Sequence, residues 1–281
     1  MAKPILSAFA DEYKADFDGQ LSGLSEFGIN NIEVRFVDGV NISALTPEAL
    51  KEAKRKLDAS KITVSAVGSP LGKVNTGDDL QAELCRAERV FQYANELECK
   101  NIRMFSFYLA ENKSAEENRG IVFSTLEKML KLASKYGVTL CHENEAKIYG
   151  ESPERCRELL DYFGGDLKCV FDMGNFVLDG YKPFPDAYML LRDYVEYFHI
   201  KDSLYAGAIV PPGCGEAQIA EIFKAHSEYA KGDFYVTLEP HLQTFSGLHA
   251  LVGKSFDNPY KFETQEAAFA VAVSKIKEII A

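Results

Sequence analysis

The sequence predicts a single-domain (β/α)8 barrel that spans residues 1–281. Eight short apolar runs alternate with amphipathic segments along the chain, as the strands and helices of such a barrel do. The 281 residues, 47% of them hydrophobic, are enough for one large core, and no linker-like stretch divides them. No GxGxxG motif follows the first apolar run, which disfavours an open dinucleotide-binding sheet.

The eight apolar runs are the predicted strands. Each run is short, and polar or turn-forming residues follow it. The runs are Ile5–Phe9, Asn31–Val34, Thr63–Val67, Ile102–Phe107, Val138–His142, Cys169–Phe171, Val195–Ile200 and Phe234–Leu238. Strands that are buried on both faces, as in a parallel sheet, carry such continuous apolar runs.

Helix signals occupy the segments between these strands. Thr46-Pro47-Glu48 and Ser152-Pro153-Glu154 each place a capping residue before a proline at the first helical position. Ser114 and Glu117 have the spacing of a capping box. The chain therefore alternates strand and helix throughout.

Further signals set the limits of helices and loops. The segment from about Thr76 to Glu98 carries apolar residues at helical spacing. Gly28 and Gly137 each follow a helical run and precede a strand, where a left-handed residue commonly ends a helix. The long connection Asp202–Gln218 is rich in proline and glycine, so we interpret it as an active-site loop and a candidate lid.

Composition narrows the class of protein. The formal net charge of −11 opposes binding to nucleic acid, because such sites need clustered lysine and arginine. The N-terminus resembles no signal segment, and no apolar stretch approaches the roughly 18 residues of a membrane span, so we expect a cytoplasmic protein without membrane contact. The six cysteines form no CxxC pair, and we expect them to be reduced and to bind no zinc.

Polar residues end four consecutive predicted strands. They are Glu143, Asp172, His199 and Glu239. In a barrel of this type the active site lies at the C-terminal ends of the strands, and the period of two along a strand allows Glu143 and Glu239 to share the barrel interior. Taken singly, each carboxylate could equally be a solvated loop residue, and the histidine more often a core residue. Together they predict a divalent-metal site, since a cation removes the repulsion between converging carboxylates.

At these residues the chain resembles the sugar phosphate isomerase/epimerase family of the xylose-isomerase-like barrel superfamily. The likeness covers almost the whole chain and is specific to the superfamily, but not to one substrate. The matching stretches are Ser7–Glu12, Ile32–Arg35, His142–Glu145, Phe171–Asn175, His199–Asp202, Pro212–Glu216 and Leu238–Pro240.

The resemblance implies roles for individual residues. The four strand-end residues would bind one divalent metal ion (Mn, Mg, Co or Zn), and Glu143 and Glu239 would also exchange protons with the substrate. Glu33, Arg35 and Lys201 stand where such proteins often contact substrate hydroxyls or phosphate, although salt bridges at the rim explain them nearly as well.

The expected reaction is isomerisation or epimerisation of a small sugar, sugar phosphate or keto-polyol. Removing a proton next to a carbonyl leaves an enediolate, and two carboxylates from different strands permit proton transfer on opposite faces. A dehydratase of a keto-polyol on the same scaffold is the alternative. A non-catalytic sugar-binding barrel and an abasic-site endonuclease are further alternatives, the last disfavoured by the acidic charge. The sequence is compatible with a homo-oligomer and leaves the substrate open.

Overall fold

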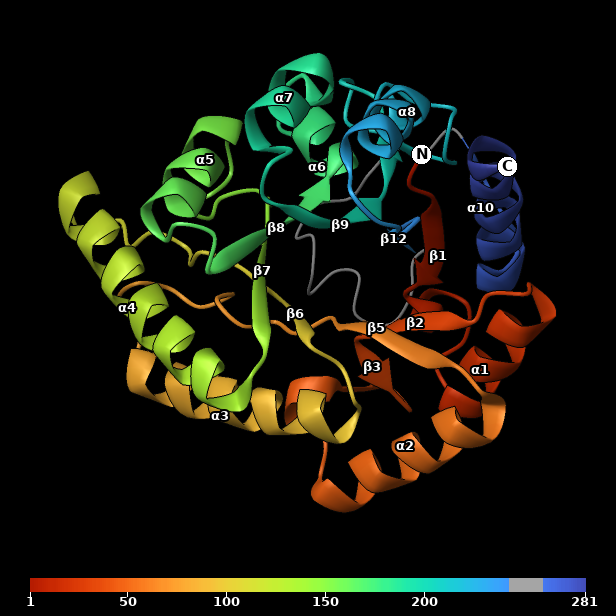
Figure 1. The fold of residues 1–281 in the computed structure, drawn as a ribbon, viewed down its shortest axis with the longest axis horizontal. Helices are drawn as coiled ribbons and strands as arrows, with labels where there is room; N and C mark the ends of the chain where they lie inside the picture. The colour runs from red at the N-terminus through yellow and green to blue at the C-terminus, as the bar shows by residue number, and fades with distance from the viewer. Residues whose placement is uncertain (243–259) are drawn as a thin grey trace.

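Eight parallel strands form the inner ring of a nearly closed barrel, and helices surround them (Figure 1). The structure, a computed structural model, describes residues 1–242 and 260–281. Hydrogen-bonded neighbours follow the order β1-β12-β9-β8-β7-β6-β5-β2. The strands are β1 (Pro4–Ala8), β2 (Asn31–Val34), β5 (Thr63–Val67), β6 (Asn101–Met104), β7 (Thr139–Glu143), β8 (Leu167–Asp172), β9 (Val195–Ile200) and β12 (Phe234–Leu238). The predicted (β/α)8 barrel is confirmed.

The helices connect successive strands along the outside of the ring. They are α1 (Phe17–Glu26), α2 (Pro47–Ser60), α3 (Leu80–Glu96), α4 (Ala115–Tyr136), α5 (Pro153–Tyr162), α6 (Met173–Leu178), α7 (Tyr188–Leu191), α8 (Ile219–Tyr229) and α10 (Gln265–Ile280). The loops carry the turns η1 (Ala10–Glu12), η2 (Ile42–Ala44) and η3 (Pro183–Ala187), and the short pairs β3 (Phe36–Val37) with β4 (Val40–Asn41) and β10 (Asp202–Ser203) with β11 (Ile209–Val210). Within the described ranges, no helix has both the length and the apolar character needed to cross a membrane.

Side chains bridge the seam where the barrel closes. Strands β1 and β2 are the two ends of the hydrogen-bonded order and contact each other. The Nδ2 atom of Asn31 donates to the carbonyl of Leu6 at 3.2 Å, and the hydroxyls of Ser7 and Ser65 are hydrogen-bonded at 2.7 Å. Polar side chains therefore join the barrel where backbone pairing ends.

The predicted helix ends are confirmed. Thr46 and Ser152 cap α2 and α5, each with a proline in the first turn. Ser114 and Glu117 make both hydrogen bonds of the capping box that begins α4. The left-handed Gly137 ends that helix with φ of 65°. Gly28 also has a positive φ, of 63°, just after α1.

Two predicted elements extended further than the observed ones. Strand β6 stops at Met104, because the backbone of Phe105 and Phe107 bonds instead to the loop after β5, at Leu71 and Gly72. Helix α3 starts at Leu80 rather than near position 76, because the backbone N–H of Thr76 donates to the carbonyl of Tyr108 in the loop after β6 at 2.9 Å. Loop-to-loop pairing is invisible to periodicity, so both errors have the same cause.

The buried hydrophobic residues of the described chain form two separate clusters. The larger lies between the strands and the helices, and contains residues such as Ile102, Leu140 and Phe198. The smaller lies inside the barrel and consists of Ala66, Cys141, Val170 and Tyr197, with the partly buried Tyr235 against it. Apolar packing is therefore concentrated between the strands and the helices. The barrel interior at the C-terminal ends of the strands is left free to hold polar groups.

His226 of α8 predicts a dependence of stability on pH. Its Nδ1 atom lies 3.1 Å from the hydroxyl of Tyr188, and its ring packs against Phe198 and Phe234. Burial lowers its pKa from 6.5 to about 4, so the unfolded chain binds more protons than the folded chain below pH 6.5. The contribution of neutral His226 to the free energy of unfolding is therefore complete above pH 6.5 and is lost as the pH falls toward 4.

Urea unfolding of the wild type and of His226→Phe checks this expectation. Lowering the pH from 7.5 to 5 should cost the wild type about 2 kcal/mol more than the variant. At pH 7.5 the variant should be less stable by about 1 kcal/mol, because it loses the hydrogen bond to Tyr188. An equal loss in both proteins on acidification would contradict the assignment.

Asp202 organises the long connection between β9 and α8. Its Oδ2 atom accepts the backbone N–H groups of Gly213 at 2.8 Å and Gly215 at 2.9 Å. Its Oδ1 atom accepts those of Ser203 at 2.9 Å and Ala217 at 3.1 Å. A Cβ at Gly215 would lie 2.2 Å from Oδ1, so the close approach requires glycine. The loop is built around one buried carboxylate, and its movement as a lid stays a prediction.

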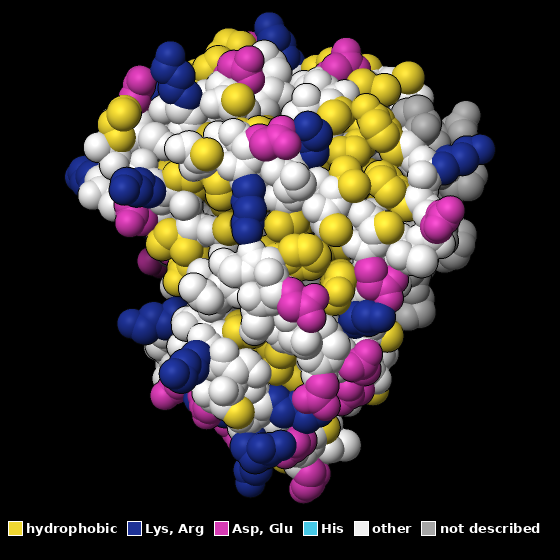
Figure 2. Space-filling model, turned by 90° about the vertical axis from the view of Figure 1, so that its right-hand side faces the viewer, with side chains coloured by type: hydrophobic (Ala, Val, Ile, Leu, Met, Phe, Trp, Pro, Cys, Tyr) yellow, Lys and Arg dark blue, Asp and Glu magenta, His cyan; other side chains and the backbone are white. Residues whose placement is uncertain are grey.

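The surface carries charges of both signs. On the face drawn in Figure 2, lysine and arginine are interspersed with aspartate and glutamate, and the described residues form no continuous basic band there. This distribution agrees with the net charge of −11. A nucleic-acid partner is therefore disfavoured on this face as well.

Candidate functional site

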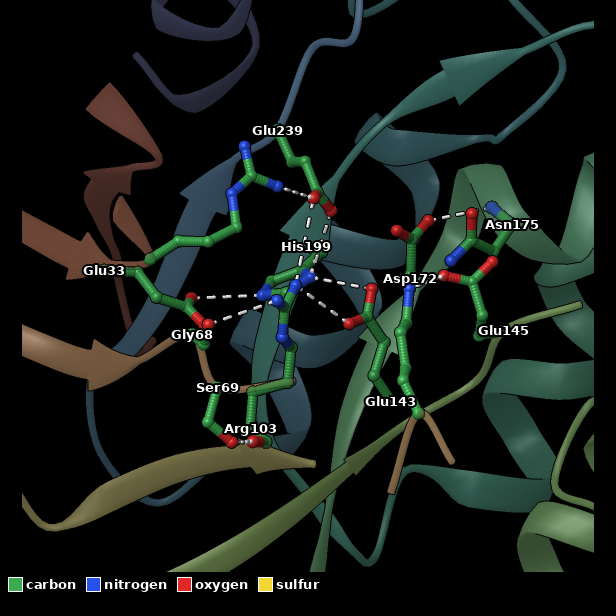
Figure 3. A network of polar contacts seen from close by, with 12 residues as sticks. Glu33, Gly68, Ser69, Arg103, Glu143, Glu145, Asp172, Asn175, His199 and Glu239 are labelled. Atoms are coloured by element: carbon green, nitrogen blue, oxygen red, sulfur yellow. Dashed lines mark hydrogen bonds and ion pairs between the residues drawn. The ribbon is translucent and has the colours of Figure 1, made fainter. Parts of the chain in front are cut away.

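All four strand-end residues come together inside the barrel. Glu143 ends β7, Asp172 ends β8, His199 lies in β9 and Glu239 follows β12. One potential ligand atom from each lies within 4.8 Å of every other, and all four side chains are buried (Figure 3). Contacts of this size suit one shared cation, whose ligands on opposite sides lie about 4 to 5 Å apart.

The strand register explains why these side chains meet. Asp172 pairs with His199 across β8 and β9, and His199 pairs with Thr237 across β9 and β12. Glu239, two positions beyond Thr237, points to the same face and donates its backbone N–H to the carbonyl of Ile200 at 3.1 Å. The pairing register of the parallel strands therefore brings the side chains of the site together.

His199 lies at the centre of the cluster. Its Nδ1 atom is 2.9 Å from Oε1 of Glu143 and 3.3 Å from Oε2 of Glu239. Its Nε2 atom is 3.0 Å from Oε2 of Glu33, on the other side of the ring. Burial alone would lower the pKa of His199, but Glu143 and Glu33 outweigh it and raise the pKa well above its usual value.

Each carboxylate of the cluster has a cationic neighbour. Nζ of Lys201 lies 3.0 Å from Oδ2 of Asp172, and Nη1 of Arg103 lies 3.2 Å from Oε2 of Glu143. Burial favours the neutral acid in both cases. For Asp172, the effect of burial is larger than the opposing effect of the Lys201 charge, and the pKa rises to about 7. For Glu143, the positive charges of His199 and Arg103 outweigh the effect of burial, and the pKa falls to about 2.

Arg35 links the cluster to the turn after β1. Its Nη1 atom lies 2.7 Å from Oε1 of Glu239, and its Nη2 atom lies 2.8 Å from Oδ2 of Asp11 and 3.2 Å from Oε1 of Glu12. Burial raises the pKa of Glu12 to about 8. Glu12, Glu239 and His241 form a second group with metal-ligand geometry. The charge of Arg35, which contacts both acids, opposes a cation there.

The predicted substrate residues are all buried among the side chains of the site. Glu33 contacts His199, Arg35 contacts Glu239, and Lys201 contacts Asp172. Lys201 also donates to Oδ1 of Asn175 at 3.0 Å. Substrate binding by these three residues stays a prediction. A salt bridge on an exposed rim does not describe them, since none of the three is more than 4% exposed.

Several participants were not assigned to this site from the sequence. The position of Arg103 opposite Cys141 in the β6–β7 ladder turns its side chain into the barrel. Tyr197 lies two positions before His199, and the period of two was a signal for it. Asp11 and Glu12 come from a turn, for which strand periodicity gives no signal.

His142 belongs to a different environment from its neighbour Glu143. Its Nε2 atom lies 2.9 Å from Oγ of Ser106, and Oγ also accepts the backbone N–H of Gly150 at 2.7 Å. The side chain is fully buried, which lowers its pKa to about 4. The alternation along β7 thus separates a structural histidine from the cluster.

The residues of the cluster fit a divalent cation. Oε2 of Glu143 and Oε2 of Glu239 are buried and have no hydrogen-bond partner among the described residues. In the connected buried network, six carboxyl groups share the cations of Arg35, Arg103 and Lys201 and the imidazole of His199; the carboxyl groups are those of Asp11, Glu12, Glu33, Glu143, Asp172 and Glu239. Carboxylate oxygens with one imidazole nitrogen form a donor set that suits Mn, Mg, Co or Zn.

The fold and the site together define a (β/α)8 barrel with a buried carboxylate–imidazole cluster at the C-terminal ends of its strands. The sequence profile of the family described as xylose isomerase-like TIM barrel matches residues 22–244, and the chain belongs to this family. A search of curated protein sequences finds no match.

Solved structures share the fold at low identity. A D-allulose 3-epimerase from Methylomonas sp. is 14% identical with a TM-score of 0.74, over 99% of this chain and 100% of that one. A probable 3-DHS dehydratase of petrobactin synthesis from Bacillus anthracis is 16% identical with a TM-score of 0.73, over 100% and 99%. A xylose isomerase-like barrel protein from Mycobacterium smegmatis, solved in complex with magnesium, is 14% identical with a TM-score of 0.70, over 99% and 98%.

Proposed function

We propose that the chain is a divalent-metal-dependent isomerase or epimerase of a small sugar, sugar phosphate or keto-polyol. One observation carries the proposal. Glu143 and Glu239 each hold a buried carboxylate oxygen that makes ion-pair contacts but no hydrogen bond within the described chain, beside the cluster that fits a cation. The two residues approach from β7 and β12, which β8 and β9 separate in the sheet order. Two carboxylates on two sides of one substrate suit proton removal and return.

Neighbouring positive charges keep the carboxyl groups of Glu143 and Glu239 ionised. Burial favours the neutral acid, but His199 and Arg103 lower the pKa of Glu143 to about 2. Lys201 and His241 likewise outweigh burial and hold the pKa of Glu239 well below its usual value. Both carboxylates are therefore ionised at neutral pH, which is the state that can accept a proton. In an isomerisation the carboxyl group that accepts the proton returns it to the neighbouring carbon. In an epimerisation the other glutamate must hold a proton beforehand, which it delivers to the opposite face.

Other residues of the chain bind and orient. A cation held by Glu143, Asp172, His199 and Glu239 would supply positive charge that polarises the substrate oxygens. Lys201 is held against Asp172 and Asn175, so its ammonium group has a fixed position beside the cluster. We assign it to the orientation of one substrate oxygen.

The similar structures support this class of reaction and one alternative. A 3-keto-D-glucoside 4-epimerase from E. coli, 15% identical with a TM-score of 0.67, joins the D-allulose 3-epimerase among them. The structure solved with magnesium supports the metal. The 3-DHS dehydratase favours the alternative, in which the same bases remove water from a keto-polyol.

A deuterium-exchange assay tests the proposal. The protein is incubated in D2O with Mn²⁺ or Mg²⁺ and a panel of ketoses, aldoses, their phosphates and keto-polyols, and the products are followed by NMR and mass spectrometry. We expect deuterium at one substrate carbon together with an isomeric product. A product that has lost one water would establish the dehydratase. Metal binding without exchange on any member of the panel would contradict both reactions and favour a sugar-binding barrel.

A further inference from the structure

A buried hydrogen-bonded chain supports His199 from the side opposite the cluster. The Tyr197 hydroxyl donates to Oε1 of Glu33 at 3.0 Å, and Oε2 of the same carboxylate lies 3.0 Å from Nε2 of His199 (Figure 3 draws Glu33 and His199). Glu33 comes from β2, whereas the other two residues come from β9. This series of hydrogen bonds therefore crosses the barrel interior from β9 to β2. None of its three side chains is more than 1% exposed.

The hydrogen bonds fix which ring nitrogen faces the cluster. An ionised carboxylate only accepts, so Glu33 accepts one hydrogen bond from Tyr197 and one from Nε2–H of His199. In the protonated ring, Nδ1–H points toward Glu143 at 2.9 Å and Glu239 at 3.3 Å, in keeping with the raised pKa of His199. A cation that displaces this proton would leave the remaining proton on Nε2 and face the lone pair of Nδ1. Turning the ring by half a revolution would set carbon atoms against all three carboxylates. The observed orientation is the one in which both nitrogens have partners.

Two aromatic rings restrict the imidazole as well. The ring of Phe9 meets it edge-on at a centroid distance of 5.1 Å, and the ring of Tyr197 lies at 5.6 Å. Tyr197 thus contacts His199 directly and also holds the carboxylate that binds it. An imidazole that packs against two aromatic rings and is hydrogen-bonded at one nitrogen presents the other nitrogen in a single direction.

We propose that Glu33 and Tyr197 are positioning residues that aim Nδ1 of His199 at the metal, and that Glu33 does not bind substrate. The inference rests on the proposed metal site and adds a supporting layer to it. Carboxylates that bind the far nitrogen of a ligating histidine fix its tautomer and raise its basicity, and their replacement typically lowers metal affinity about 10- to 100-fold. Glu33 occupies this position, and Tyr197 anchors it from behind.

Calorimetric titration of the metal-free protein with Mn²⁺ tests the proposal. Glu33→Gln keeps the shape of the side chain and removes its charge, and we expect Mn²⁺ to bind about 10- to 100-fold more weakly. Tyr197→Phe removes only the second hydrogen bond and should weaken binding less than about tenfold. Glu83→Gln is the matched control, because Glu83 is also 1% exposed and bonds only to Gly72 N and Arg86 among the described residues. Its Mn²⁺ affinity should equal that of the wild type.

An NMR measurement separates aiming of the ring from general loss of structure. In the Mg²⁺-loaded wild type, the ¹⁵N-histidine spectrum should place the His199 proton on Nε2, with a downfield N–H resonance that moves upfield in Glu33→Gln. The proton on Nδ1, or Mn²⁺ affinity unchanged in a folded Glu33→Gln protein, would overturn the inference alone. A wild type that binds no divalent metal would overturn the metal site and the inference together.

Discussion

Glu239→Gln is expected to reduce turnover on the substrate identified by the exchange assay about 10²- to 10⁴-fold, the usual contribution of a positioned general acid or base. The amide cannot accept the substrate proton, and it also removes one negative charge from the cluster. Arg35, whose Nη1 lies 2.7 Å from Oε1, still has the amide oxygen as an acceptor. The decisive reading is deuterium exchange at fixed, saturating Mn²⁺, which isolates proton transfer from metal loss.

The same Glu83→Gln variant is the control, since it replaces an equally buried glutamate outside the cluster. It should keep wild-type turnover, and both variants should unfold cooperatively in a thermal scan. Full turnover of Glu239→Gln with metal bound would remove Glu239 from the reaction. Exchange that persists while product formation stops would instead assign Glu239 to the return of the proton.

Asp172→Asn is expected to abolish the stabilisation that a divalent metal gives the fold. For the wild type, Mn²⁺ at 100 times its dissociation constant should add about 2.7 kcal/mol to the free energy of unfolding. In a protein of this size that is a rise in melting temperature of roughly 5–10 °C. Asn keeps an oxygen for the backbone N–H of Asn175, which Asp172 caps at 2.8 Å, so the variant should still fold. What it loses is the anionic ligand.

Melting curves with and without Mn²⁺ provide the measurement. The shift should fall below about 1 °C in Asp172→Asn at the same Mn²⁺ concentration, and chelation should remove activity from the wild type until metal is restored. A full thermal shift in Asp172→Asn would show that Asp172 is not a ligand. Wild-type turnover that survives complete chelation would contradict the metal-dependent mechanism.

The barrel and its four central residues were predictable because they depend on local patterns. In a parallel barrel, consecutive strands end at one face, so a polar residue at the end of an apolar run has a predictable place. Asp172 directly follows a buried run, and Glu143 follows from alternation along β7. Neither assignment needs knowledge of a distant part of the chain.

The contacts that tune the site could not be predicted in this way. Glu33 and His199 are 166 positions apart, and Arg35 and Glu239 are 204 apart. Their pairing depends on closure of the ring and on the rotamers of long side chains, neither of which leaves a periodic trace in the sequence. The same reason explains why Glu33 and Arg35 were predicted at the site, while their contacts there were not.

The division between the two buried hydrophobic clusters has a consequence for how this chain can change. The apolar layer that stabilises the barrel lies outside the strands, and the side chains that carry the proposed chemistry lie inside them. A substitution among these interior side chains therefore leaves the outer apolar packing intact, but removing one charge of the buried network leaves its partner unpaired and costs about 3 to 5 kcal/mol. Interior side chains of such a barrel are therefore expected to change in matched pairs that keep each buried acid beside a buried base.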